Sequence, residues 1–179
     1  DRQLLPAAGP LIMREFGISP KDFGWLVTAF SASYAPFALL AGWFFDRVGL
    51  RWGIVVAVAV WSAFGAGLGA AASFTMLAAF RFALGAPLAA AIPGSGKANA
   101  TFLKPEELAF GGTINQVGIS AAGIAAPLLV GRLGESLGWR PLFVAAGLAG
   151  FLWIPLWLWI TRNTPAASRS HSAAASIPM

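Results

Sequence analysis

The sequence predicts an all-α membrane protein in which several helices cross a lipid bilayer. Hydrophobic residues make up 58% of the chain and charged residues only 11%, whereas soluble domains carry about 25% charged residues. A soluble chain this short could not keep so much apolar surface away from water. The apolar stretches are long and show no strand-like alternation. A backbone in lipid must satisfy its own hydrogen bonds, so these stretches are expected to be helices.

Charge-free stretches define the expected spans. A helix needs about 20 apolar residues to cross hydrocarbon about 30 Å thick. The interval from Trp52 to Gly96 holds one charge, Arg81, and is too long for one crossing, so a turn is expected near residues 71–75. Five complete spans are therefore predicted, at residues 23–45, 52–71, 75–98, 108–131 and 141–161.

The two ends of the chain continue this pattern. Residues 1–13 are apolar but too few to cross, and we expect them to be the remainder of a first helix that begins upstream. Residues 1–162 would then form the membrane part. Residues 163–179 are small, polar and rich in Ser and Pro, which predicts a cytoplasmic linker or a cut end.

Basic residues in alternate loops predict the orientation. One side collects Arg47, Arg51, Lys97, Lys104, Arg162 and Arg169, and the other collects Arg14, Lys21, Arg132 and Arg140. The larger set is expected on the cytoplasmic side by the positive-inside rule. The chain is accordingly predicted to be a multi-pass protein of a plasma membrane, which in a bacterium is the inner membrane.

Residue types needed for catalysis or metal binding are nearly absent. The chain has no cysteine, and its single histidine, His171, lies in the polar tail, so no Ser–His or Cys–His arrangement exists. Residues 92–97 resemble a phosphate loop but lack its first glycine and the Ser or Thr after the lysine. We therefore expect no enzyme activity, metal or cofactor. The net charge of +5 is scattered singly between apolar runs and does not indicate nucleic-acid binding.

Arg81 is the charge that stands out at membrane depth. It lies about seven residues into its predicted span, on the order of 10 Å below the surface. A guanidinium there costs roughly 2.5–3.5 kcal/mol on insertion scales, so it is expected to face a cavity or a partner; the other reading is a snorkelling arginine. Asp1 and Arg2 lie at similar depth if the first helix continues upstream. The resulting excess of positive charge predicts an anionic substrate, although an acid elsewhere in a longer chain could balance it.

A second group of charges follows the first complete span, in residues 42–51. Asp46 and Arg47 come directly after an apolar run, and Arg51 precedes the next. Because a negative charge near a helix C-terminus is unfavourable, Asp46 is expected to have a dedicated cationic or helix N-terminal partner. The alternative is an ordinary charged turn.

These ten residues match the Gly-x-x-x-Asp-Arg-x-Gly-x-Arg signature that major facilitator superfamily transporters carry between their second and third helices. The matching residues are Gly42, Asp46, Arg47, Gly49 and Arg51. Most of the remaining chain resembles the anion:cation symporter branch, which includes organic-acid and sugar-acid permeases. That resemblance rests on Asp1-Arg2, residues 15–19 and 24–26, Tyr34, the segment from Arg81 to Lys97, and residues 138–140.

The resemblance implies the N-terminal six-helix bundle, with its first helix truncated, of a twelve-helix major facilitator fold that works by alternating access. It also implies proton-coupled symport of a small organic anion such as a sugar acid. Asp1 would carry the proton, Arg2, Tyr34 and Arg81 would bind the anion, and the motif at residues 42–51 would belong to a cytoplasmic gate. The bilayer and the second half of the same chain would be its other partners.

One position departs from the branch. A glutamate that the branch carries seven residues after the helix 4 arginine is replaced by Leu88, which cannot titrate. An antiporter or facilitator for another small polar solute therefore remains open, as does a non-transporting membrane sensor or scaffold. Asn115 and Gln116 are polar residues in the span at 108–131 and would contact the ligand or hydrogen-bond to another helix.

Overall fold

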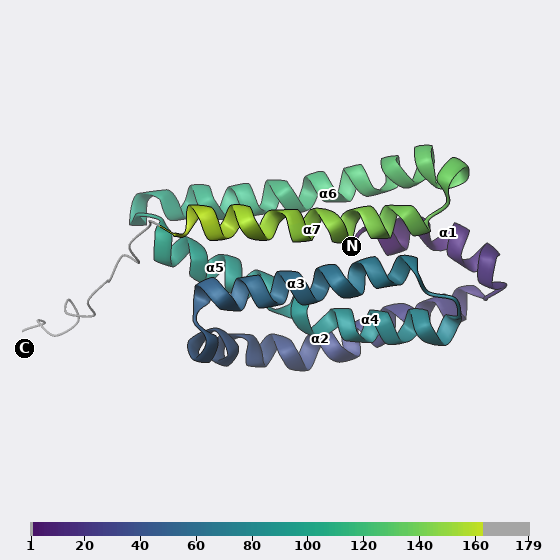
Figure 1. Ribbon diagram of the computed structural model, residues 1–179, viewed down its shortest axis with the longest axis horizontal. Helices are drawn as coiled ribbons and strands as arrows, with labels where there is room; N and C mark the ends of the chain where they lie inside the picture. Colours follow the sequence, from purple (N-terminus) through teal and green to yellow (C-terminus); the bar gives the residue numbers. More distant parts are fainter. Residues whose placement is uncertain (1, 163–179) are drawn as a thin grey trace, which may run out of the picture.

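The computed structural model describes residues 2–162, which form a bundle of helices running side by side along one axis (Figure 1). Among these residues the structure contains helices and turns but no strand. The helices, in chain order, are α1 (Leu4–Phe16), α2 (Pro20–Val48), α3 (Leu50–Gly69), α4 (Phe74–Ala89), α5 (Ala91–Phe102), the 3-10 turn η1 (Pro105–Glu107), α6 (Leu108–Leu137) and α7 (Arg140–Ile160).

Five helical stretches are long and apolar enough to cross a membrane, counting α4 with α5 and η1 with α6 as single stretches. The spans expected at 23–45, 52–71, 108–131 and 141–161 fall mostly within α2, α3, α6 and α7. The segment at 1–13 is largely α1, which at 13 residues is too short to cross. How much of each helix lies in hydrocarbon stays a prediction, and the segment at 163–179 lies outside the described residues.

The helices extend beyond the charge-free stretches because local caps, rather than charges, end them. Ser19 begins α2 through a capping box in which its side chain accepts from the backbone N–H of Asp22 at 3.2 Å and the Asp22 carboxylate accepts from the Ser19 backbone at 3.1 Å. At the other end, Gly49 has φ of 82° and separates α2 from α3. Asp46 and Arg47 consequently lie in the last helical turn of α2.

The helix expected over 75–98 is interrupted at Ala90, where α4 ends and α5 begins one residue later. Pro93, near the start of α5, is the physical reason. It has no backbone N–H to donate to the carbonyl of Ala89, the last residue of α4, and its ring clashes with that carbonyl. At the break the hydrogen-bond ladder tightens, and the Ala90 N–H donates to the Pro87 carbonyl at 3.2 Å.

Two pairs of helices approach closely at glycines. A Cβ on Gly85 of α4 would lie 2.5 Å from the Phe30 carbonyl oxygen of α2, and one on Gly147 of α7 would lie 2.6 Å from the Ser62 carbonyl oxygen of α3. Only glycine permits this spacing, as is common between membrane helices. The α2–α4 and α3–α7 contacts are therefore the closest packed in the bundle.

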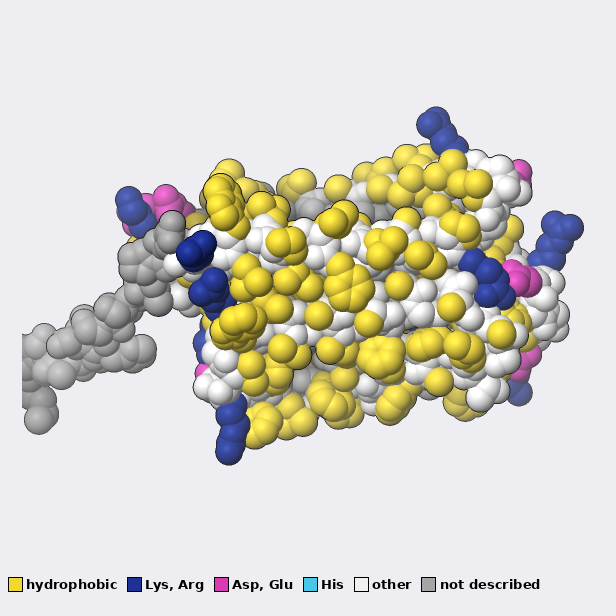
Figure 2. All heavy atoms as spheres, in the orientation of Figure 1, with side chains coloured by type: hydrophobic (Ala, Val, Ile, Leu, Met, Phe, Trp, Pro, Cys, Tyr) yellow, Lys and Arg dark blue, Asp and Glu magenta, His cyan; other side chains and the backbone are white. Residues whose placement is uncertain are grey.

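The face seen in Figure 2 is apolar across the middle and carries its charged side chains at both ends. Leu39, Leu152 and Trp159 are 86%, 75% and 73% exposed, respectively. Contiguous apolar surface of this extent is incompatible with water but suits lipid. The chain is a multi-pass integral membrane protein.

Candidate functional site

Arg81 occupies the interior of the bundle, between α4 and α2. Its side chain is buried, with 3% relative exposure. Its guanidinium carbon lies 5.0 Å from the centre of the Phe30 ring. Arg81 and Gly85 lie four residues apart on one face of α4. The close approach that Gly85 permits therefore brings the arginine against the aromatic face of α2.

The Arg81 guanidinium has more N–H donors than there are acceptors around it. Its Nε and Nη1 atoms are buried and have no hydrogen-bond partner among the described residues. Both ion pairs in that part of the chain involve other residues. A guanidinium presents five N–H donors in a planar fork that fits a carboxylate. These donors would be satisfied by an anion that brings its own acceptors.

Two aromatic rings continue from Arg81 toward the start of the chain. Phe30 and Tyr34, four residues apart on α2, stack with ring centres 5.5 Å apart and an interplanar angle of 30°. The Arg2 guanidinium carbon lies 5.5 Å from the centre of the Tyr34 ring. Two cations therefore flank one aromatic pair, an arrangement favoured by the negative faces of the rings.

The structure thus brings together three of the predicted binding residues, Arg2, Tyr34 and Arg81, and adds Phe30 between them. Phe30 was not predicted, although its position four residues before Tyr34 on the same helix face was a usable signal. Asp1, the predicted proton carrier, lies outside the described residues. Asn115 and Gln116 are exposed on α6, which packs mainly on α1, α5 and α7. The roles of all these residues stay predictions.

Leu88, which replaces the glutamate of the related branch, is partly buried and packs against the main apolar cluster of the bundle. Its side chain therefore has a packing role that a carboxylate could not take over without losing hydration. No acid among the described residues replaces it beside Arg81 in an ion pair.

The motif at residues 42–51 lies at the end of the bundle that carries the α2–α3 turn. Asp46 forms an ion pair with Lys97 of α5, which is the cationic partner expected for an acid at a helix C-terminus. The Asp46 side chain is 71% exposed and that of Lys97 is 41% exposed. Exposed pairs of this kind contribute about 0–1 kcal/mol, so the pair is easily broken and remade.

The other motif residues have separate roles in the fold. Arg51 donates from Nη2 to the Leu158 carbonyl of α7 at 3.2 Å, and the Trp157 indole N–H donates to the Arg51 carbonyl at 3.2 Å. These bonds tie the start of α3 to the end of α7. Arg47 lies over the Trp43 ring at 5.3 Å. Gly42 faces open space, and Gly49 takes the positive φ that ends α2.

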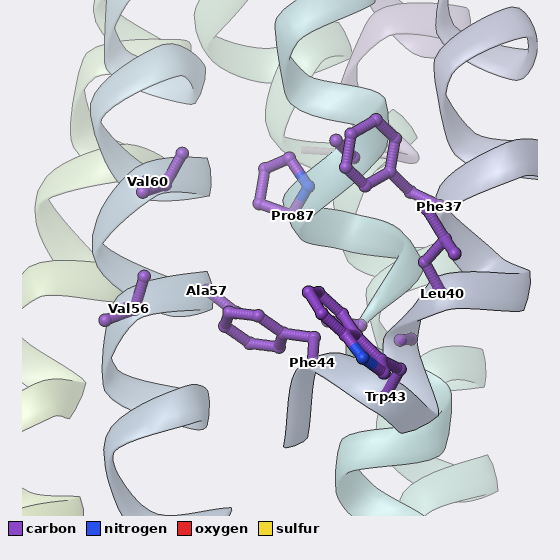
Figure 3. Close-up of a pocket in the computed structure, with 11 residues that line it drawn as sticks. Phe37, Leu40, Trp43, Phe44, Val56, Ala57, Val60 and Pro87 are labelled. Atoms are coloured by element: carbon purple, nitrogen blue, oxygen red, sulfur yellow. The ribbon is translucent and has the colours of Figure 1, made fainter. Parts of the chain in front are cut away.

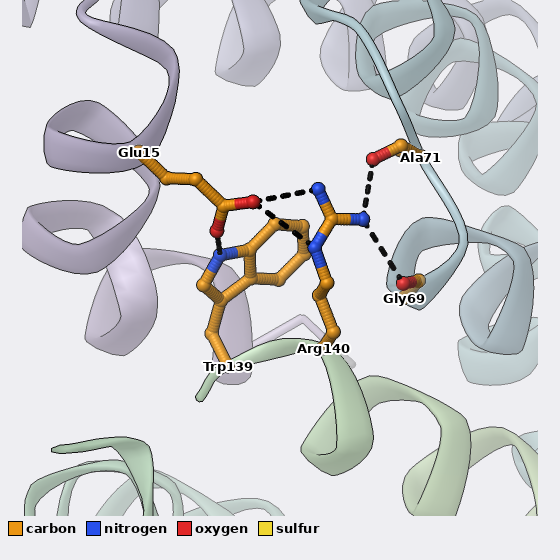
Figure 4. A network of polar contacts seen from close by, with 5 residues as sticks. All are labelled: Glu15, Gly69, Ala71, Trp139 and Arg140. Atoms are coloured by element: carbon orange, nitrogen blue, oxygen red, sulfur yellow. Dashed lines mark hydrogen bonds and ion pairs between the residues drawn. The ribbon is translucent and has the colours of Figure 1, made fainter. Parts of the chain in front are cut away.

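A polar network that the sequence did not suggest closes the opposite end (Figure 4). The Glu15 carboxylate accepts from the Trp139 indole N–H at 2.6 Å and from Arg140 Nη2 at 2.7 Å. Arg140 Nη1 donates to the carbonyls of Gly69 at 3.3 Å and Ala71 at 2.5 Å. The hydrogen bond from Arg140 holds the pKa of Glu15 below its usual value. The network joins the ends of α1 and α3 to the start of α7.

Comparisons with known proteins agree with this architecture. The model of the Major Facilitator Superfamily matches residues 1–178. A hexuronate transporter of Escherichia coli K12 is 31% identical over 157 residues, covering 88% of this chain and 36% of the transporter. A galacturonate transporter of Dickeya chrysanthemi is 29% identical over 162 residues, covering 90% of this chain and 47% of the transporter. A D-galactonate transporter of Escherichia coli O6:H1 is 29% identical over 163 residues. The chain spans less than half the length of these relatives.

Proposed function

The chain belongs to the major facilitator superfamily, and we propose that it is the N-terminal half of a twelve-helix secondary transporter for a small organic anion. The buried and unpaired guanidinium of Arg81 is the observation that carries this proposal. A bare charge at membrane depth is costly. An anion that enters the site lowers that cost, and the binding free energy is then available for transport.

We infer that the substrate is a carboxylate of the sugar-acid class. The relatives in the comparison are named for hexuronate, galacturonate and D-galactonate. The carboxylate would accept from Arg81 in bidentate geometry, and Tyr34 and Arg2 would bound the site on its other side. The Phe30 and Tyr34 faces are suited to pack against the C–H surface of a sugar ring.

Uptake into proteoliposomes tests this proposal. The full-length protein that contains this chain is reconstituted and given labelled glucuronate or galactonate. Arg81→Lys and Arg81→Leu are compared with Arg132→Leu, which removes an exposed arginine from α6. Truncating one partner of a buried, hydrogen-bonded charge pair costs about 2–5 kcal/mol, which is about thirtyfold or more in affinity. Uptake by Arg81→Leu at the wild-type rate would sink the proposal.

Coupling to protons is the finer part of the proposal. We propose symport with Asp1 as the proton carrier, because Leu88 removes the other acid expected of the related branch. An inward proton gradient should accelerate uptake by the wild type, and Asp1→Asn should abolish that acceleration.

A second candidate, exchange or facilitated diffusion, is favoured by the packed and non-titratable Leu88. It predicts that a pH gradient has no effect on uptake, and exchange in particular predicts that preloaded anion accelerates it. A protein that carries no solute under any of these conditions would instead fit the sensor or scaffold reading.

A further inference from the structure

An apolar groove lies between α2, α3 and α4 (Figure 3), and neither Arg81 nor Phe30 nor Tyr34 lines it. Its volume is about 260 Å³, and every side chain that lines it is apolar or aromatic. Phe37, Trp43 and Phe44 of α2 project toward Val56 of α3 and Pro87 of α4. Pockets for drug-sized ligands measure about 300–1,000 Å³ and include polar groups that orient the ligand. The groove instead suits a single linear hydrocarbon chain.

Small residues on three helices create the hollow. Three alanines face the groove at positions where larger side chains would fill it. They are Ala57 of α3, Ala86 of α4 and Ala90 at the junction of α4 and α5. Ala90, where α4 and α5 are separated, is itself one of the residues that line the groove. The buried Phe45 packs with the lining alanines Ala57 and Ala90. Its ring also lies against Gly53 of α3 and Gly94 of α5, where added Cβ atoms would approach to 2.7 Å. The groove is therefore preformed rather than a gap between loosely packed helices.

The depth of the groove corresponds to one leaflet. Val56 and Val60 lie six and ten residues after the start of α3 at Leu50, or about 9–15 Å along its axis. Half of a hydrocarbon core about 30 Å thick is about 15 Å. With the α2–α3 turn at the headgroup level, as the span prediction places it, these lining residues would lie between that level and the bilayer centre. Basic residues predict that this end is cytoplasmic.

A cation stands at the headgroup end of the groove. The Arg47 guanidinium carbon lies 5.3 Å from the centre of the Trp43 ring, and Trp43 lines the groove. Arg47 is exposed and takes no part in the two ion pairs of residues 2–162, while the neighbouring Asp46 is occupied by Lys97. Arginine and tryptophan are residues that membrane proteins place at the interface. An anionic headgroup would complement this charge.

We propose that the groove holds an acyl chain of an anionic phospholipid whose phosphate contacts Arg47. The chain would cover the exposed faces of Trp43 and Val60, and the phosphate would accept hydrogen bonds from the guanidinium. This proposal needs only that the chain is embedded in a membrane, and it is independent of the transported solute.

Lipid retention by the full-length protein tests the proposal. The protein is purified in mild detergent, and native mass spectrometry measures bound phosphatidylglycerol against phosphatidylcholine with the same acyl chains. Arg47→Ala should lower phosphatidylglycerol occupancy about fivefold, the effect of one basic residue at an anionic surface. It should lower phosphatidylcholine occupancy less, because the choline group cancels the charge of the phosphate. Arg162→Ala, an exposed arginine at the same end, serves as the charge control.

Filling the groove separates the acyl chain from the headgroup. Ala86→Leu should lower the occupancy of both lipids, and Val60→Trp repeats the test at a half-exposed lining position in case the first variant folds poorly. Ala149→Leu on the exposed face of α7 is the matched control. Equal lipid occupancy in the groove variants and this control would overturn the proposal. So would a photo-crosslinker at position 43 that captures another part of the same protein instead of lipid.

Discussion

Replacement of Arg81 by methionine should make the protein more stable and unable to bind the proposed anion. Methionine keeps the length and flexibility of the side chain but removes the charge and its two unpaired nitrogen atoms. A guanidinium at this depth costs about 2.5–3.5 kcal/mol. Its position over the Phe30 ring, at 5.0 Å, returns about 0.5–2 kcal/mol. The net gain on substitution is then about 0.5–3 kcal/mol, or a rise of one to several degrees in Tm.

Thermal unfolding with and without substrate measures both effects. The full-length protein is unfolded in detergent, alone and with glucuronate. An anion at a hundred times its Kd stabilises the wild type by about 2.7 kcal/mol, and it should not stabilise Arg81→Met. Arg132→Met, an exposed position on α6, should keep the ligand shift and the wild-type Tm.

The opposite result has a clear meaning. A lower Tm for Arg81→Met without ligand would mean that the guanidinium is already compensated in the resting protein, and that its lack of partners is not the basis of anion binding. A ligand shift preserved in Arg81→Met would place the anion elsewhere.

Three further predictions concern stability. Gly85→Ala should destabilise the protein by about 1–3 kcal/mol, because the new Cβ meets the backbone of α2, whereas Gly24→Ala, in open space, should be nearly neutral; similar Tm losses for both would contradict the close approach. The lowered pKa of Glu15 means that its carboxylate stabilises the fold above its ordinary titration range near pH ~4.3 and loses this effect as the pH falls through the lowered value. Wild type should therefore be more stable than Glu15→Gln at neutral pH, by at most about 1 kcal/mol at this exposed site, and the Tm difference between them should vanish in acid. A Tm difference that grew in acid would count against the network. A double-mutant cycle on Asp46 and Lys97 should give a coupling below about 1 kcal/mol; a larger value would show that the pair is shielded from water.

The helical membrane fold follows from the sequence because bilayer thickness sets the length of each apolar stretch. Charge positions alone indicated where the turns lie, but they do not define where the helices end. Asp46 and Arg47 remain helical because Gly49, not the first charge, ends α2. The break at Ala90 reflects Pro93, which has no N–H for the Ala89 carbonyl, and the span predicted over 75–98 did not take this proline into account.

The site was only partly predictable for a similar reason. Arg81 was identified because a lone charge in an apolar span has a cost that the sequence reveals. Its contact with Phe30 depends on the approach of α4 to α2 at Gly85, which is a tertiary property. Arg51 donates to a backbone carbonyl of α7, and such an acceptor has no side-chain signature. The expected cationic partner of Asp46 exists, but its identity as Lys97 required the fold.

The two ends of the bundle carry built-in fluorescent reporters. At one end the Trp139 indole N–H donates to the Glu15 carboxylate, and at the other the Trp157 indole N–H donates to the Arg51 carbonyl. Indole emission shifts to longer wavelength when the ring is exposed to water. Versions that keep only one of these tryptophans would therefore report, by the wavelength of their emission, which end of the bundle opens to water.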